Sequence, residues 1–162
     1  MNTFLGWFTA FHTLLSFVAI IAGVIAIRDI AAGRFRSGAI TTFLVTAVLT
    51  SVTGFFFPFH GPTPAIGVGI VALIVLVWTL GARRSMGRSS FWVAQFPLGV
   101  VISEYFLVFV LVAQTFAKVP ALAALPPDLQ KKLFGATQLI VLIAFVVIAV
   151  RTTRLFRVRA IA

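Results

Sequence analysis

The chain of 162 residues is 61% apolar and only 10% charged, and its 13 basic residues outnumber its 3 acidic residues. A soluble domain carries about 25% charged residues, so this chain has too little polar surface to cover a core in water. It contains no cysteine, which excludes disulfides, thiolate metal sites and thiol catalysis. The net charge of +10 lies in short clusters between apolar runs, a pattern that indicates membrane topology and not a nucleic-acid-binding surface.

Five apolar segments follow one another, each near the length of about 20 residues that a membrane-spanning helix needs. They lie at about residues 4–27, 38–57, 64–82, 91–117 and 133–150. Long apolar runs favour helices, because a helix satisfies its backbone internally, whereas barrel strands would alternate. The first segment has no basic residues before it and is too long for a cleavable signal peptide. The sequence therefore predicts an all-α membrane protein, a single-domain bundle of five transmembrane helices.

Small and hydroxylated side chains indicate how these helices pack. Pairs of small residues four apart let helix backbones approach, and the chain has such pairs at Ala19–Gly23, Ala22–Ala26 and Ala65–Gly69. The second segment carries threonines along one face, which suits either helix packing or the lining of a polar seam: Thr42, Thr46, Thr50 and Thr53. After the fourth segment, Pro126 and Pro127 predict the start of a short helix over residues 126–133.

The distribution of basic residues predicts the orientation. In a five-helix arrangement, ten arginines fall on one side of the membrane: Arg28, Arg34, Arg36, Arg83, Arg84, Arg88, Arg151, Arg154, Arg157 and Arg159. Three lysines fall on the other side: Lys118, Lys131 and Lys132. Because basic loops stay in the cytoplasm, we expect the N-terminus outside and the C-terminus in the cytoplasm. We also expect the basic tail, residues 151–162, to lie along the anionic lipids of the inner leaflet and to bind no nucleic acid.

Glu104 is the most unusual residue, because only Tyr105 is also ionisable within residues 98–112. A carboxylate at mid-bilayer costs several kcal/mol unless it is protonated, paired or wetted, so an acid there is a functional hypothesis by default. The alternative is structural, with a protonated carboxyl group bonded to a serine, a threonine or a backbone carbonyl.

Further polar side chains fall in the outer half of the predicted bundle. His12 and Gln138 lie about four residues outward of their helix centres, roughly 6 Å from the level of Glu104, and Thr50 reaches a similar depth. Gln114 and Lys118 then lead toward the outer surface. Each of these groups is equally suited to be an interhelical hydrogen-bond partner. The candidates for binding a ligand or a proton are Glu104, His12, Gln138, Gln114, His60, Thr50 and Lys118, and no residue is assigned a catalytic role.

Metal and haem sites find few ligands in this chain. A catalytic zinc site needs three protein ligands, whereas the chain has two histidines and one acid within a predicted span, so we expect no metal site. A bis-histidine haem would need both His12 and His60, whose predicted depths differ by roughly 10 Å. His60 also suits an exposed position in its proline-rich loop. Haem or quinone binding is therefore kept only as an alternative.

Two motifs resemble a known family. Residues 53–61 (TGFFFPFHG) and 109–122 (FVLVAQTFAKVPAL), with Pro126, Pro127, Phe134 and Gln138 further on, are similar to a family of small uncharacterised bacterial polytopic inner-membrane proteins. The resemblance covers residues 40–150. It implies a multi-pass protein of the bacterial cytoplasmic membrane, and it carries no activity with it.

Three functions remain open from the sequence. Few groups are suited to chemistry, which favours a non-enzymatic accessory subunit of a membrane complex or a protein that binds a lipophilic ligand, as a homo-oligomer or beside a partner subunit. Phenylalanines near the outer ends of the second and fourth segments would suit a quinone or a lipid. The first alternative is a proton- or ion-coupled transporter that uses Glu104 and His12. The second is a redox protein that binds haem or quinone.

Overall fold

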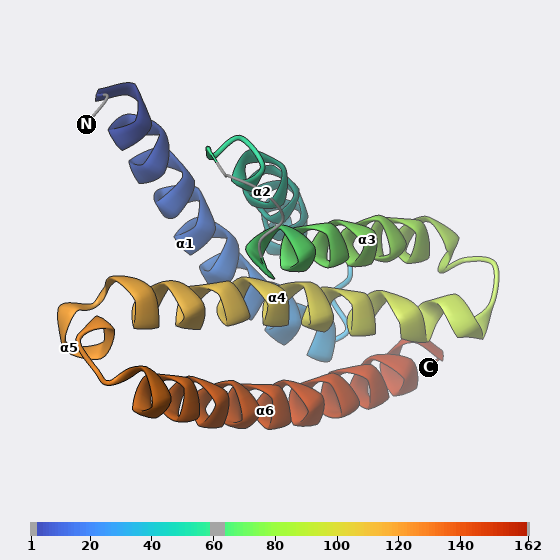
Figure 1. The fold of residues 1–162 in the computed structure, drawn as a ribbon. Coiled ribbons are helices and arrows are strands. Elements are labelled where there is room, and N and C mark those ends of the chain that lie inside the picture. The colour runs from blue at the N-terminus through green and yellow to red at the C-terminus, as the bar shows by residue number, and fades with distance from the viewer. Residues whose placement is uncertain (1–2, 59–63, 162) are drawn as a thin grey trace.

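The computed structural model describes residues 3–58 and 64–161 and is all-helical, with no strand among these residues (Figure 1). The all-α prediction is therefore confirmed. The helices are, in chain order, α1 (Thr3–Ala31), α2 (Gly38–Gly54), α3 (Pro64–Ser85), α4 (Ser90–Lys118), α5 (Pro120–Ala123) and α6 (Pro127–Ile161).

Four of these helices are long and apolar enough to cross a membrane, namely α1, α3, α4 and α6. Their number and composition indicate a membrane protein. The remaining apolar helix, α2, has 17 residues, at the lower limit of the about 17–25 that a span requires. It ends three residues earlier than the apolar run, because Phe55 and Phe56 turn back onto the carbonyl groups of Val52 and Thr53 before Pro58.

The helices pack around α4, which lies between α3 and α6 (Figure 1). The N-terminal helix α1 packs along α2 and crosses α4, and it also contacts α6. Side chains fully removed from solvent collect where α1, α3 and α6 end and where α2 and α4 begin: Ala26, Ile30, Ile40, Phe43, Ala82, Phe96, Val100 and Phe156. The packed core therefore lies toward one end of the bundle.

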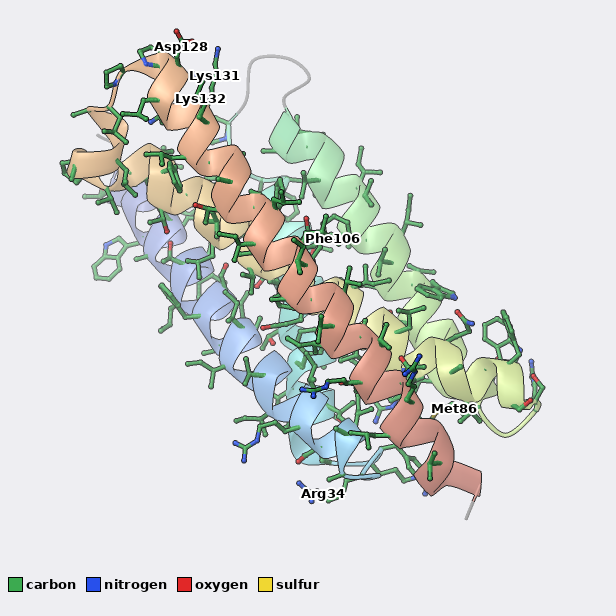
Figure 2. The ribbon with its side chains drawn as sticks, turned by 90° about the horizontal axis from the view of Figure 1, so that it is seen from below. Arg34, Met86, Phe106, Asp128, Lys131 and Lys132 are labelled. Carbon is green, nitrogen blue, oxygen red and sulfur yellow. The ribbon has the colours of Figure 1, made fainter. Side chains whose placement is uncertain are left out.

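That end also carries the arginine-rich loops. Figure 2 shows Arg34 and Met86 at one end of the bundle, and Asp128, Lys131 and Lys132 at the other. The α1–α2 turn is fixed by a Schellman motif, in which Gly33 adopts φ 81° and the amides of Gly33 and Arg34 bond the carbonyl groups of Ile30 and Asp29. The Asp29 carboxylate then pairs with the Arg34 guanidinium.

The last helix differs from the prediction. Instead of a separate short helix over residues 126–133, α6 begins at Pro127 and continues without a break to Ile161. Proline suits the first turn, and no further proline follows it before the end of the helix. At 1.5 Å per residue, the 35 residues extend about 52 Å, well beyond the about 30 Å of a bilayer core. The basic tail is thus a helical extension of α6 within the described residues.

The small-residue pairs of α1 mark a helix contact, as predicted. Ala19, Ala22, Gly23 and Ala26 are all buried along one stripe of α1. The pair on α3 is different, because Ala65 is exposed and only Gly69 is covered, by the ring of Phe55. A Cβ at position 69 would lie 3.1 Å from that ring.

Candidate functional site

The Glu104 side chain lies where three helices meet. It projects from α4, is 0% exposed, and places its carboxyl group directly against Gly23 of α1. A Cβ built on Gly23 would collide with Glu104 Oε2 and would lie 2.5 Å from its Cδ. The same point is 2.9 Å from Cδ2 of Phe43, which comes from α2. The missing side chain of Gly23 therefore makes the space that the carboxyl group fills.

The carboxyl group has no hydrogen-bond partner among the described residues, for either oxygen. The hydroxyl groups of Ser103, which precedes Glu104 on α4, and of Thr50 on α2 are also buried. Neither has a hydrogen-bond partner among the described residues. Burying an unpaired polar group is unfavourable, and burying an unpaired charge far more so. A buried carboxyl group without a partner in its own chain is therefore either uncharged or bonded to another molecule.

The acids of this chain are too far apart to act as a pair. Among the three that the sequence contains, Asp29 pairs with Arg34 and Asp128 lies in the first turn of α6. Glu104 therefore faces no second carboxyl group with which to share a proton or hold a metal. Its chemistry is limited to holding one proton, accepting one cation, or filling space between helices.

His12 is not close to Glu104, so the expected depth relationship between them is wrong. Glu104 meets Gly23, which lies eleven residues from His12 along α1, about 16 Å. The half-buried His12 ring instead faces α2, where its Nδ1 is 2.9 Å from Thr53 Oγ1 and its edge meets the Phe57 ring. Thr53 Oγ1 also lies 2.7 Å from the Leu49 carbonyl oxygen, and the histidine tautomer decides which of His12 Nδ1 and Thr53 Oγ1 donates in their shared bond.

The other candidates are dispersed along the bundle. Gln138 is buried on α6 and donates from Nε2 to the Phe109 carbonyl oxygen of α4, at 3.0 Å, which makes it an interhelical link. Thr50 is buried on α2. Gln114 and Lys118 are exposed near the end of α4, and His60 lies outside the described residues. His12 thus bonds to α2 and Gln138 to α4, and neither bonds Glu104.

Two features escaped the sequence analysis. The first is a close α3–α4 contact, where a Cβ at Gly99 would collide with Thr79 Oγ1 and lie 3.2 Å from the Thr79 Cα. The second is an open pocket between the α1–α2 turn and the end of α3, with Arg36 and Arg83 among its walls. Its signal in the sequence is the triplet Arg34-Phe35-Arg36, in which a phenylalanine lies between two arginines. The topology prediction uses only the charges of these arginines.

Fold and sites together define an all-helical protein with long apolar helices and isolated buried polar groups. No family model, curated protein or solved structure matches this chain. The resemblance of residues 53–61 and 109–122 to a bacterial membrane-protein family stays a prediction. The function is therefore argued from the residues themselves.

Proposed function

We propose that this chain is a five-span protein of the bacterial cytoplasmic membrane, with its N-terminus outside, that serves as a non-enzymatic binding or accessory subunit. The observation that carries this proposal is the isolation of its polar groups. Glu104 sits at the α1–α4 crossing, His12 bonds to Thr53, and Gln138 bonds to the backbone of α4. An activated nucleophile normally has a general base within hydrogen-bond reach, and none of these three groups bonds another of them.

The proposed orientation draws support from the two ends of the bundle. Arg34 lies at the end opposite Lys131 and Lys132 (Figure 2). The greater number of basic residues favours the cytoplasm for the arginine-rich end. If α2 also crosses the membrane, the loops at residues 32–37 and 86–89 lie on the same side of it. The basic end of α6 then lies on that side as well.

The flanks of the bundle support a role in contacts within the membrane. Along α6, large apolar side chains stay exposed on the side away from α4, among them Leu139, Ile140 and Ile143 at 56–68%. Such a continuous apolar surface is normally covered by lipid tails, a lipophilic ligand or a partner helix. A homo-oligomer or a larger membrane complex would cover it equally well.

The test is to extract the full-length protein with its surrounding lipids in copolymer discs and analyse it by native mass spectrometry. The proposal expects a second membrane subunit, a second copy, or a lipophilic molecule in fixed ratio to the chain. A monomer that carries only bulk lipids in their membrane proportions would contradict it.

A second function, proton-coupled transport, is favoured by one specific observation. Glu104 is fully buried and neither of its oxygens bonds a described residue, which is how an acid that exchanges protons or binds a transported cation would be placed. His12 takes no part in this version, because about 16 Å of α1 separate it from Gly23.

Proteoliposomes decide between these two functions. Proton flux after an imposed pH gradient is compared for the native chain, for Glu104→Gln and for His12→Gln. Transport by Glu104 predicts flux that Glu104→Gln abolishes and His12→Gln retains, with both variants folded. An accessory role predicts the same flux in all three samples as in empty liposomes.

A further inference from the structure

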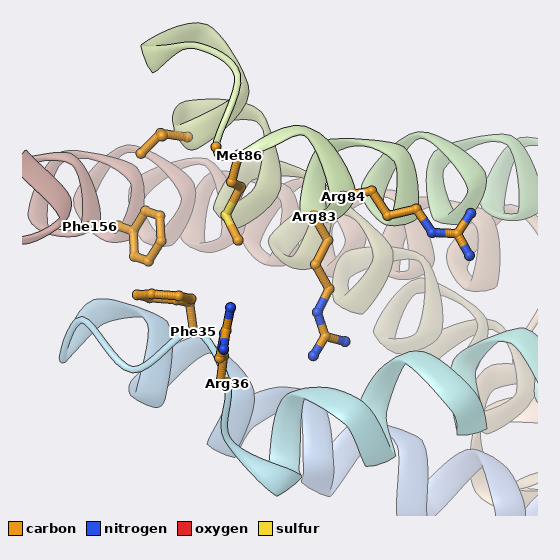
Figure 3. A pocket seen from close by; sticks show the side chains of 8 residues that line it. Phe35, Arg36, Arg83, Arg84, Met86 and Phe156 are labelled. Atoms are coloured by element: carbon orange, nitrogen blue, oxygen red, sulfur yellow. The ribbon is translucent and has the colours of Figure 1, made fainter.

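An open pocket of about 640 Å³ lies at the arginine-rich end. Figure 3 shows Arg36 and Arg83 extending from opposite walls toward the same space. The rings of Phe35 and Phe156 and the side chain of Met86 form an apolar wall beside them (Figure 3). The pocket thus places two guanidinium groups next to an apolar surface.

Local structure positions these side chains. The Schellman turn at Gly33 ends α1 and sends Phe35 back onto Phe156, with which it makes an edge-to-face contact at 6.2 Å. Ser37 caps α2 by accepting a bond from the Ile40 amide, so Arg36 stands between two fixed residues. On the other wall, Arg83 donates to Thr41 Oγ1 at 3.4 Å. The fold therefore positions the backbone of Arg36 and the guanidinium group of Arg83.

No acidic side chain among the described residues neutralises these arginines. Asp29 is paired with Arg34, Glu104 is buried beside Gly23, and Asp128 lies at the opposite end of the bundle. The sequence contains no fourth acid. Two guanidinium groups that face the same pocket repel each other, and an anion bound between them relieves this repulsion, so the pocket favours an anionic ligand.

We propose that this pocket binds the headgroup phosphate of one anionic phospholipid, with Arg36 and Arg83 as phosphate ligands and an acyl chain along Phe35, Met86 and Val93. Guanidinium groups suit phosphate because their donors match its oxygens in pairs. Basic pockets between membrane helices at headgroup level bind anionic lipids, and the apolar wall distinguishes a lipid from a free anion. The inference rests on the part of the proposed function that places the chain in a bilayer, and its two phosphate ligands lie outside the tail of α6.

The test uses the full-length chain, delipidated in detergent and titrated by native mass spectrometry with phosphatidylglycerol, phosphatidylcholine or inorganic phosphate. Arg36→Gln/Arg83→Gln removes both phosphate ligands. Arg88→Gln/Arg151→Gln is the matched control, since both arginines are exposed, lie outside the pocket and carry the same charge. Thermal unfolding of both double variants reports that they fold, and single Arg36→Gln, at an exposed position, serves if the first pair does not.

The native chain should bind one phosphatidylglycerol in preference to phosphatidylcholine. Each arginine near an anionic lipid contributes about fivefold, so Arg36→Gln/Arg83→Gln should lower this affinity about 30-fold, and Arg36→Gln alone about fivefold. The control pair should change it by less than about threefold, since these side chains do not reach the pocket. Equal losses in both pairs, or no preference between the two lipids, would overturn the site. Displacement of the lipid by inorganic phosphate at millimolar concentration would show a free-anion site and would overturn the lipid assignment. Loss of membrane insertion in a separate topology test would instead refute the proposed function.

Discussion

The carboxyl group of Glu104 occupies the space that a side chain on Gly23 would need. This contact joins α4 to α1 at the point where Phe43 of α2 also approaches. A single glycine thus allows a membrane helix to cross another whose facing residue is an acid. The same relationship explains why Glu104 is sealed from solvent although it ends in a polar group.

Replacing Gly23 with alanine should destabilise the bundle. The new methyl group would collide with Glu104 and press on the Phe43 ring, and overpacking of this kind costs about 1–3 kcal/mol. Gly6→Ala on the same helix is the matched control and should be close to neutral, because nothing lies within 4 Å of a Cβ there. Denaturant titration in detergent micelles measures both. Equal losses at the two positions would contradict the close contact.

The Glu104–Gly23 contact also predicts coupling between the two positions. In a Glu104→Ala background, Gly23→Ala should be less damaging than in the native chain, because the colliding carboxyl group is gone. A double-mutant cycle on the free energy of unfolding gives the coupling. If the losses of unfolding free energy in the two single variants simply add in the double variant, the two residues are not in contact.

Leucine in place of Glu104 should leave the fold intact. No described residue bonds either carboxyl oxygen, so an apolar side chain of similar size loses no hydrogen bond and removes a buried polar group. We expect Glu104→Leu to be neutral or stabilising by about 1 kcal/mol in thermal unfolding. A loss beyond about 1 kcal/mol would reveal a hydrogen-bond partner that a ligand or another subunit supplies.

The α3–α4 contact gives a parallel prediction. Gly99→Ala should cost about 1–3 kcal/mol, because its methyl group would meet both the hydroxyl and the backbone of Thr79. Gly81→Ala, two residues from Thr79 on the exposed side of α3, should have little effect, since a Cβ there meets nothing within 4 Å. Unfolding midpoints of the two variants should therefore differ, and matching midpoints would refute this contact.

Gln138 provides a hydrogen bond between α6 and α4. Gln138→Leu removes the bond to the Phe109 carbonyl oxygen and should cost about 0.6 kcal/mol, a common value for a hydrogen bond between membrane helices. Gln114→Leu is the control, because Gln114 is exposed on α4. The measurement is the difference in unfolding free energy between the two variants. A larger loss for Gln114→Leu would place the polar link elsewhere.

Hydropathy predicted the helices well and their ends less well. The first apolar run was placed at residues 4–27, whereas α1 continues through Arg28 and Asp29 until Gly33 takes a positive φ. At the start of α6, the polar turn after Pro127 is part of the long helix. Apolar length reports what a bilayer can cover, but capping and proline positions decide where a helix stops.

The candidate site could be predicted only residue by residue. Glu104 stood out because an acid in an apolar run is rare, and Gly23 belonged to a small-residue pair that favours close packing. Their meeting depends on how α1 crosses α4, which a single sequence does not encode in any local pattern. The depth relationship between Glu104 and His12 failed for this reason, because it assumed helices centred at one common level.

Labelling of single cysteines tests the central claim, that the chain crosses the membrane five times with its arginine-rich loops in the cytoplasm. The chain has no native cysteine, so Ala32→Cys, Ser89→Cys and Ala124→Cys, all at exposed loop positions, each give an unambiguous signal with a membrane-impermeant maleimide. In intact spheroplasts, Ala124→Cys should be labelled, whereas Ala32→Cys and Ser89→Cys should react only after lysis. If only one of Ala32→Cys and Ser89→Cys is labelled before lysis, the two positions lie on opposite sides and α2 does not cross the membrane. If both are labelled before lysis, the orientation is the reverse of the one proposed.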